Sequence, residues 1–155
     1  MLSQTTEYAL RAMAALAYRP EELTPTPLLA ATTKVPSNYL AKVLQQLAGA
    51  ELIVGRRGVG GGYRLARPAS QISLLEVVRS VSKVERITTC PLGLPNHGPN
   101  LCPLHKKVDE MLCKVIETYD GVSLQDLLDQ PGQNMPLCDE SRTAKLRVDP
   151  ALRKG

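Results

Sequence analysis

The chain has 155 residues, of which 43% are hydrophobic and 22% charged, as expected for a soluble protein that is either one compact domain or a small domain with an extension. No apolar run approaches the length of a membrane span and the N-terminus has no signal-peptide core, so we expect a cytoplasmic protein and no membrane partner. The net charge of +4 is unevenly spread, because residues 1–85 hold ten basic and six acidic side chains while residues 86–155 hold nine of each. This asymmetry favours a polyanionic partner for the first half of the chain.

Two helices are predicted at the start of the chain. Residues 3–18 place apolar side chains on one helical face, and Pro20 ends that helix. A second, short helix begins in the segment 24–27, and residues 32–36 form the turn that follows it. These two helices supply the first arm of a helix-turn-helix.

A third helix is predicted from Ser37, which we expect to be its N-cap, to Gly49, where a helix commonly stops. Its apolar residues recur at the spacing of one helical face: Leu40, Val43, Leu44 and Leu47. The opposite face carries hydrogen-bonding side chains with a single full charge among them: Asn38, Lys42, Gln45 and Gln46.

A basic, glycine-rich hairpin is predicted next, with strands at residues 52–54 and 63–65. The connection between them holds five glycines and the pair Arg56 and Arg57. A polar-faced helix beside a basic hairpin is typical of a winged helix-turn-helix, whose helix enters the major groove while the wing lies on phosphates. The alternative is a winged helix that binds only protein, with the arginines at a solvated loop tip. A dinucleotide-binding loop is not favoured, because the glycines lie between two strands.

The second half of the chain begins with a capping box at residues 73–76, which opens a helix over residues 74–81. Residues 86–102 hold three prolines and two glycines without any period and are predicted to be a loop. A long helix with a broad apolar stripe follows over residues 103–119, and a short helix over 122–129. Because the stripe follows a completed core, it indicates pairing with a second subunit; packing on the chain's own first helix is the alternative.

Cysteine and histidine residues gather in the predicted loop. The spacing C-x6-H-x4-C-x2-H joins Cys90, His97, Cys102 and His105, and these are both histidines of the chain. In a cytoplasmic protein such clustering favours a zinc or iron–sulfur site over a disulfide. The alternatives are buried thiols beside solvated imidazoles, and a thiol switch between the two loop cysteines. Of the other two cysteines, Cys113 is predicted to lie in a core, and Cys138 to be a free thiol in the tail.

Several segments in this order resemble the Rrf-two family of winged-helix regulators (the IscR, NsrR and CymR type) from residue 1 to about 130. They are TTEYALRAM, VPSNYLAKVLQQL, GRRGVGGGYRLARPASQISLLEVVRSV, the cysteine-containing loop and VSLQDLL. The resemblance implies a dimeric DNA-binding repressor or activator, often holding an iron–sulfur cluster that reports on iron, nitric oxide or redox state. It also implies which residues approach DNA. Side chains of the third helix would meet bases and phosphates, and the wing would border the minor groove: Ser37, Asn38, Tyr39 and Lys42, then Arg56, Arg57, Gly60 and Gly61.

The resemblance also implies a ligand set. Cluster-binding members carry C-x5-C-x5-C with a histidine three residues after the last cysteine, which matches Cys90, Cys102 and His105. The middle position is Asn96, which is no ligand for iron–sulfur, and His97 follows it. Glu7 occupies the position from which some members donate an acidic ligand to the partner subunit. Two centres remain open: a [2Fe–2S] cluster held by the two cysteines, His105 and either His97 or Glu7, or a tetrahedral Cys2His2 zinc site.

The predicted fold is therefore mainly α, a winged helix-turn-helix with a small β-hairpin wing and a long C-terminal dimerisation helix. Its parts are a DNA-binding domain at 1–85, a metal-binding loop at 86–102, a dimerisation helix with a short terminal helix at 103–130, and a flexible tail at 131–155. The predicted function is a cytoplasmic homodimer that binds double-stranded promoter DNA under control of an iron–sulfur cluster. A zinc-bound or thiol-switch regulator and a protein-interaction module are the alternatives; no acid/base or nucleophile arrangement suggests an enzyme.

Overall fold

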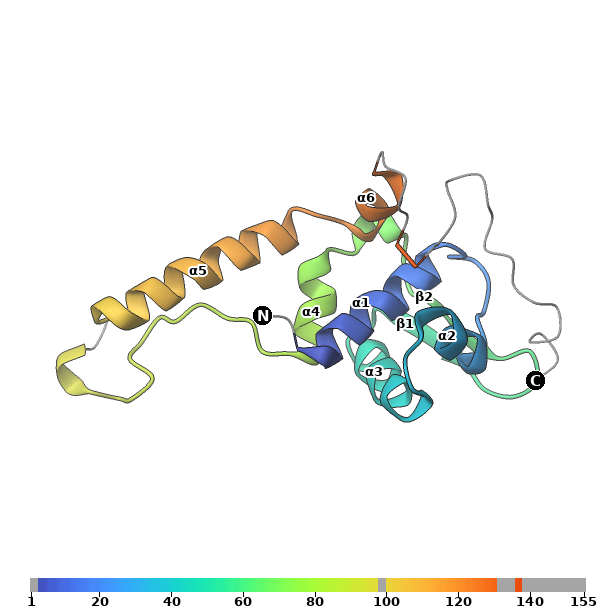
Figure 1. Ribbon diagram of the computed structural model, residues 1–155, viewed down its shortest axis with the longest axis horizontal. Helices are drawn as coiled ribbons and strands as arrows, with labels where there is room; N and C mark the ends of the chain where they lie inside the picture. Colours follow the sequence, from blue (N-terminus) through green and yellow to red (C-terminus); the bar gives the residue numbers. More distant parts are fainter. Residues whose placement is uncertain (1–2, 98–99, 131–135, 138–155) are drawn as a thin grey trace.

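The helices and the hairpin follow the order that the sequence periodicity predicts in the computed structural model, which describes residues 3–97, 100–130 and 136–137 (Figure 1). The body consists of three helices, a two-stranded antiparallel hairpin, a 3-10 turn and a fourth helix: α1 Gln4–Ala17, α2 Thr26–Thr33, α3 Ser37–Gly49, β1 Ile53–Arg56, β2 Gly62–Leu65, η1 Ala69–Gln71 and α4 Leu74–Val81. The second half adds three elements: η2 Pro95–His97, α5 Pro103–Asp120 and α6 Leu124–Asp129. The mainly helical winged-helix fold is confirmed.

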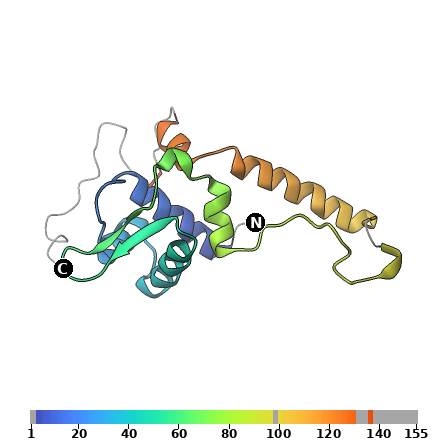
Figure 2. The same cartoon turned by 180° about the vertical axis from the view of Figure 1, so that it is seen from behind.

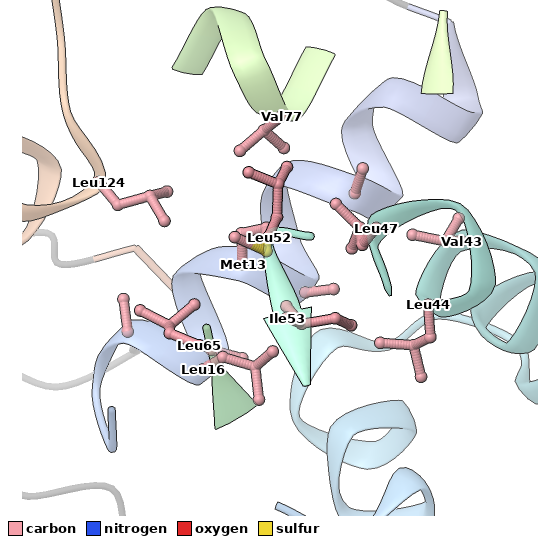
Figure 3. Packing of buried hydrophobic residues seen from close by; sticks show 14 of the residues in the cluster. Met13, Leu16, Val43, Leu44, Leu47, Leu52, Ile53, Leu65, Val77 and Leu124 are labelled. Carbon is pink, nitrogen blue, oxygen red and sulfur yellow. The ribbon is translucent and has the colours of Figure 1, made fainter. Parts of the chain in front are cut away.

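The core of the body surrounds α1. The last four residues of α1, three alanines and Leu16, are buried, and Met13 and Leu16 have no exposed surface (Figure 3). Leucines of α3, the hairpin base and α4 close over it, and Leu124 of α6 joins from the far end of the chain. The chain has no Phe and no Trp, so small side chains let these helices approach closely.

The start of α3 differs from the prediction in one detail, and its end agrees with the prediction. Ser37 is the first helical residue and not the N-cap; Pro36 occupies the cap without a side-chain bond, and its carbonyl accepts from the amides of Tyr39 and Leu40 at 3.0 and 2.9 Å. The fixed φ of proline sets the entry to the helix, which leaves the serine hydroxyl exposed. At the other end, α3 stops at Gly49 as predicted, and the residue in the left-handed region after it is Glu51 (φ 58°).

The second half returns to the body through two capped helices. Ser73 and Glu76 form the predicted capping box of α4, and Ser123 and Asp126 form a second one on α6, which therefore begins at Leu124, two residues later than predicted. The two caps lie side by side, because Leu74 donates to the carbonyl of Val122 and Leu124 donates to that of Ile72, both at 2.9 Å. This pairing fixes the C-terminal end of α5 to the body.

Between α4 and α6 the chain forms an arm, which we define as residues 83–120. Figures 1 and 2 show α5 and the preceding loop projecting away from the body, with η2 at the tip and the hairpin turn at the opposite end of the molecule. No helix in the described ranges is long and apolar enough to cross a membrane. The predicted tail lies mostly outside the described residues, as does Cys138; of its described part, Pro136 accepts a hydrogen bond from Tyr18 Oη at 2.7 Å and Leu137 packs against the core.

Candidate nucleic-acid interface and metal-binding loop

The outward face of α3 carries all four side chains that were expected to meet DNA. Ser37, Asn38, Tyr39 and Lys42 are exposed, while the leucines and valine of the same helix are buried in the core. The amphipathic pattern thus turns a row of hydrogen-bonding groups to solvent on a helix held firmly from behind. Such a face suits contact with the edges of bases in a major groove.

The start of α1 supports the start of α3. The ring of Tyr39, half exposed, lies 6.2 Å from the ring of Tyr8 at an angle of 59°, within the usual range for an aromatic pair. Arg11 on the next turn of α1 donates to Glu7 Oε1 at 2.9 Å and to the carbonyl of Thr33 at 3.4 Å. Thr33 is the last residue of α2, so Arg11 joins Glu7 to the turn that leads into α3.

The base of the wing is fixed to the body through its backbone. Thr24 and Tyr63 exchange two hydrogen bonds, of 2.8 and 2.9 Å, which extend the hairpin by one bridge. The neighbouring Gly62 has a φ of 148°, and a Cβ at this position would lie 2.3 Å from the carbonyl oxygen of Thr24. Glycine is needed here because the two backbones are in direct contact.

The turn of the wing is tightened by glycines and by one of the two arginines. Gly58 and Gly60 have φ values of 91° and 71°, and Gly61 donates to the carbonyl of Gly58 at 3.0 Å. Arg56 donates from Nη2 to the carbonyl of Gly60 at 3.3 Å. Within the described residues Arg57 makes no hydrogen bond or ion pair and is exposed. The two arginines therefore differ. Arg56 stabilises the turn, whereas the guanidinium of Arg57 remains available to bind a negatively charged group.

The loop brings its sulfur and nitrogen donors together as two pairs. Cys90 Sγ lies 3.9 Å from His97 Nδ1, and Cys102 Sγ lies 3.4 Å from His105 Nδ1. Two thiols and two imidazoles match in chemistry a zinc ion or a mixed-ligand iron–sulfur centre. No three Cys, His, Asp or Glu side chains converge as a metal site among the described residues, however. The donors are thus of the right chemical type for such a centre, and each Cys–His pair would supply two of its four ligands.

Glu7 lies apart from both pairs in its own chain. It belongs to α1 in the body, whereas η2 marks the tip of the arm (Figure 1). Its carboxylate is occupied by Arg11. A role for Glu7 as a ligand therefore requires the loop of a second copy.

An ion pair that the sequence did not reveal holds the loop against α5. Arg86 donates to both oxygens of Asp109, at 2.7 and 2.6 Å, and the amide of Ile87 donates to the same carboxylate at 2.8 Å. The bidentate guanidinium keeps the pKa of Asp109 below its usual range and raises that of Arg86. The available signal was a lone acid on the helical face that also carries Leu112, Cys113 and Ile116.

Cys113 is not a core residue, in contrast to the prediction. It is half-buried in the arm, where its Sγ lies 3.4 Å from Nη1 of Arg86 and donates to Oε1 of Glu117 at 3.2 Å. The hydrogen bond to Glu117 raises the pKa of the Cys113 thiol, because it stabilises the protonated form. The apolar stripe on α5 does not place this position inside a core, because Cys113 contacts the charged side chains of Arg86 and Glu117 and is not part of the hydrophobic cluster of the described residues.

The apolar stripe of α5 is largely uncovered. Leu104 and Met111 are each 68% exposed and Val108 is 41% exposed, while Asp109 is the only buried residue that this helix contributes. The helix does not pack along α1, so that alternative is wrong; its C-terminal end contacts the body, with Tyr119 against the core (Figure 2).

Known proteins share this arrangement over most of the chain. The Rrf2 family model, described as an iron-dependent transcriptional regulator, matches residues 2–130. A protein of Aquifex aeolicus assigned as an HTH-type transcriptional regulator is 26% identical over 131 residues, covering 83% of this chain and 91% of that protein.

Solved structures agree in fold. S. aureus CymR is 26% identical, with a TM-score of 0.66 and coverage of 84% of this chain and 99% of that one. T. potens IscR is 24% identical, with a TM-score of 0.65 and coverage of 86% and 93%. CymR of B. subtilis, described as its global cysteine regulator, is 23% identical, with a TM-score of 0.66 and coverage of 82% and 95%. The polar face of α3, the glycine-rich wing and the match over residues 2–130 together show that the chain belongs to the Rrf2 family of transcriptional regulators.

Proposed function

We propose that two copies of this chain form a cytoplasmic homodimer that binds a promoter operator, with its DNA affinity set by a metal centre, foremost a [2Fe–2S] cluster, in the loop 90–105. The observation that carries the DNA-binding part is the exposed polar face of α3 next to a rigid wing whose Arg57 has no partner among the described residues. DNA would offer base edges as hydrogen-bonding partners for α3 and negatively charged phosphates as partners for the wing.

The dimer is supported by the exposed stripe on α5. Its three most exposed apolar side chains, Leu104, Val108 and Met111, have no cover within the described chain, although apolar surface of this kind is normally buried. Pairing two arms would cover the stripes and leave the two bodies free to present α3 helices to successive major grooves, about 34 Å apart.

The metal centre would be held by Cys90, Cys102 and His105, with a fourth donor from His97 or from Glu7 of a second copy. An iron–sulfur cluster of this type supplies one-electron redox chemistry, and imidazole ligands raise its potential. The chain's own contribution is to hold each thiol beside an imidazole and to tie the loop to α5 through Arg86 and Asp109.

Side chains of α1 connect Glu7, the proposed ligand, with the helix that would bind DNA. Arg11 shares its guanidinium between Glu7 and the carbonyl of Thr33, and Tyr8 supports Tyr39. A Glu7 engaged elsewhere would leave Arg11 with a single partner at the turn before α3. A small local change at Glu7 would thus alter the support of residues that face DNA.

The metal is tested by anaerobic purification, metal analysis and a visible spectrum. We expect absorbance between about 400 and 500 nm, as thiolate-ligated iron–sulfur centres show, and its loss in Cys90→Ala and in His105→Ala. Cys113→Ala is the matched control, because it removes a thiol of the arm outside the loop and should keep the spectrum. A colourless protein with stoichiometric zinc would overturn the cluster and leave a zinc-bound regulator, for which the two Cys–His pairs supply a Cys2His2 set. A spectrum unchanged in both loop variants would refute the ligand set.

DNA binding is tested with duplexes selected from a randomised pool at about 50 mM salt, where phosphate contacts are strong. Arg57→Ala should weaken binding to most sequences and lower the salt dependence by about one phosphate contact per subunit. Lys107→Ala removes the same charge from an exposed site on α5 and should bind normally. A protein that binds no duplex under these conditions, with or without its metal, would instead be a protein-interaction module.

A further inference from the structure

The apex of the wing carries one apolar side chain that no part of the fold explains. Val59 is fully exposed, more so than any other large hydrophobic residue of the described chain. It lies between Gly58 and Gly60, so no neighbouring side chain shields it. Its isopropyl group is therefore the only apolar group at the outermost turn of the molecule's DNA-binding half.

The backbone beneath Val59 forms a tight turn with close contacts between its two sides. Both flanking glycines have positive φ values, which other residues rarely adopt. A Cβ at Gly61 would lie 2.2 Å from the carbonyl oxygen of Arg56, so the two sides of the turn are in direct contact. The Arg56–Gly60 hydrogen bond adds to these contacts, and the Thr24–Tyr63 bridge attaches the base of the wing to the body. A loop tip that needed only to be soluble would not require this set of constraints.

We propose that Val59 is the wedge that the wing inserts into the minor groove of DNA, against the sugar walls and the edge of one base step. The shape fits, because glycines on both sides leave a tip one side chain wide for a groove about 6 Å wide. The charge fits as well, since Arg57 is exposed and without a partner in the described chain, two residues away. Proteins that bind the minor groove often place an apolar side chain beside an arginine in this way and partly unstack a step.

The proposal predicts a preference for sequence without a hydrogen bond to any base. Pyrimidine–purine steps such as TA and CA unstack easily, whereas A-tracts are stiff. A wedge at Val59 would therefore favour operators with a flexible step under each wing. This inference rests on the proposed binding of DNA and is independent of the metal centre.

The test compares Val59→Ala with the unmodified protein on selected duplexes that carry 2-aminopurine at the step under the wing. We expect about tenfold weaker binding, an unchanged salt slope, and loss of the fluorescence increase that unstacking produces. Val59→Thr, which keeps the shape and replaces one methyl group by a hydroxyl, should retain most of the fluorescence change. Val54→Ala is the matched control, because Val54 is a partly exposed valine of β1 away from the apex.

The outcomes separate this inference from the function on which it rests. If the unmodified protein binds no duplex, the proposed function itself fails. If it binds DNA and Val59→Ala binds equally well with the same fluorescence, only the wedge is refuted. A loss of affinity accompanied by a lower salt slope would also refute it, because the residue would then act by positioning Arg57.

Discussion

In the body, the 14 residues of α1 contribute eight buried side chains, whereas the 18 residues of α5 in the arm contribute only Asp109. The body is thus held by close packing of aliphatic side chains. The arm is held by a charged pair, Arg86 with Asp109, and by its attachment to the body at one end. An element with so little buried surface has little stability of its own.

The body and the arm are therefore suited to different roles. The body can present α3 and the wing in a fixed geometry, because its core sets their positions. The arm carries the exposed apolar stripe and the four sulfur and nitrogen donors. Within the described chain, no apolar surface covers the stripe and the four donors do not converge on one site. Under the proposed function, the metal centre and the pairing surface would both lie on the part that is less stable alone, where a local change can alter the structure most easily.

The largest expected effect comes from opening a cavity in the body. Leu16→Ala removes a side chain with no exposed surface from the centre of the core and should lower the free energy of unfolding by about 3 kcal/mol. Leu104→Ala makes the same chemical change on the exposed stripe of the arm and should change it by less than about 0.5 kcal/mol for the monomer.

Denaturant unfolding at one fixed protein concentration measures the first effect. Sedimentation as a function of concentration measures dimer dissociation, which Leu104→Ala should favour if α5 is the pairing surface. Equal losses of stability in the two variants would contradict the division into a packed body and an uncovered arm.

The sequence predicted the body far better than the arm, for a physical reason. Helical periodicity reports which face of a helix is buried, so α1 and α3 and their buried faces followed from the apolar spacing, and α4 followed from its capping box. The turn residues were harder. Pro36 as the cap and Glu51 in the left-handed region depend on backbone geometry that composition does not encode uniquely.

The arm and the site were predicted only in part. The spacing of cysteines and histidines predicted four donors, and the structure places these residues as two Cys–His pairs; their role as ligands stays a prediction. The Arg86–Asp109 pair joins residues 23 positions apart in a region without a core, so the sequence shows an acid on an apolar face but does not indicate which cation pairs with it. The different roles of Arg56 and Arg57 were equally inaccessible, because the two are chemically identical and only the path of the turn separates them.

A smaller effect is expected at the junction of the wing with the body. Gly62→Ala places a methyl group against the carbonyl of Thr24, 2.3 Å away, so the wing must move; we expect a loss of about 1–3 kcal/mol in the free energy of unfolding. Gly49→Ala is the matched control, since a Cβ there meets nothing within 4 Å on a helical backbone and should stabilise by about 0.5 kcal/mol. Thermal unfolding distinguishes the two, and a tolerated Gly62→Ala would show that the wing is not fixed at Thr24.

The smallest effect on the body is expected from Asp109→Asn, which tests whether the arm depends on charge. The exchange keeps the shape of the side chain and removes its attraction for Arg86, so the body should unfold as before while the loop separates from α5. The amide of Ile87, which donates to Asp109 at 2.8 Å, reports this directly through faster hydrogen exchange. Glu110→Gln is the control, because Glu110 pairs with Lys107 on the exposed side of the same helix and should leave Ile87 protected.

The direction of the pKa shift of Asp109 determines how the Arg86–Asp109 pair responds to pH. The pKa of Asp109 is lower in the folded arm than in an unfolded chain, because Arg86 and the amide of Ile87 stabilise the carboxylate. The contribution of the pair is therefore complete above the ordinary carboxyl pKa of about 4 and is lost as the pH falls through the lowered value. Protection of Ile87, corrected for intrinsic exchange, should fall over that range in the unmodified protein and stay low throughout in Asp109→Asn. Equal protection in both proteins at neutral pH would mean that packing, and not this charge pair, holds the loop to α5.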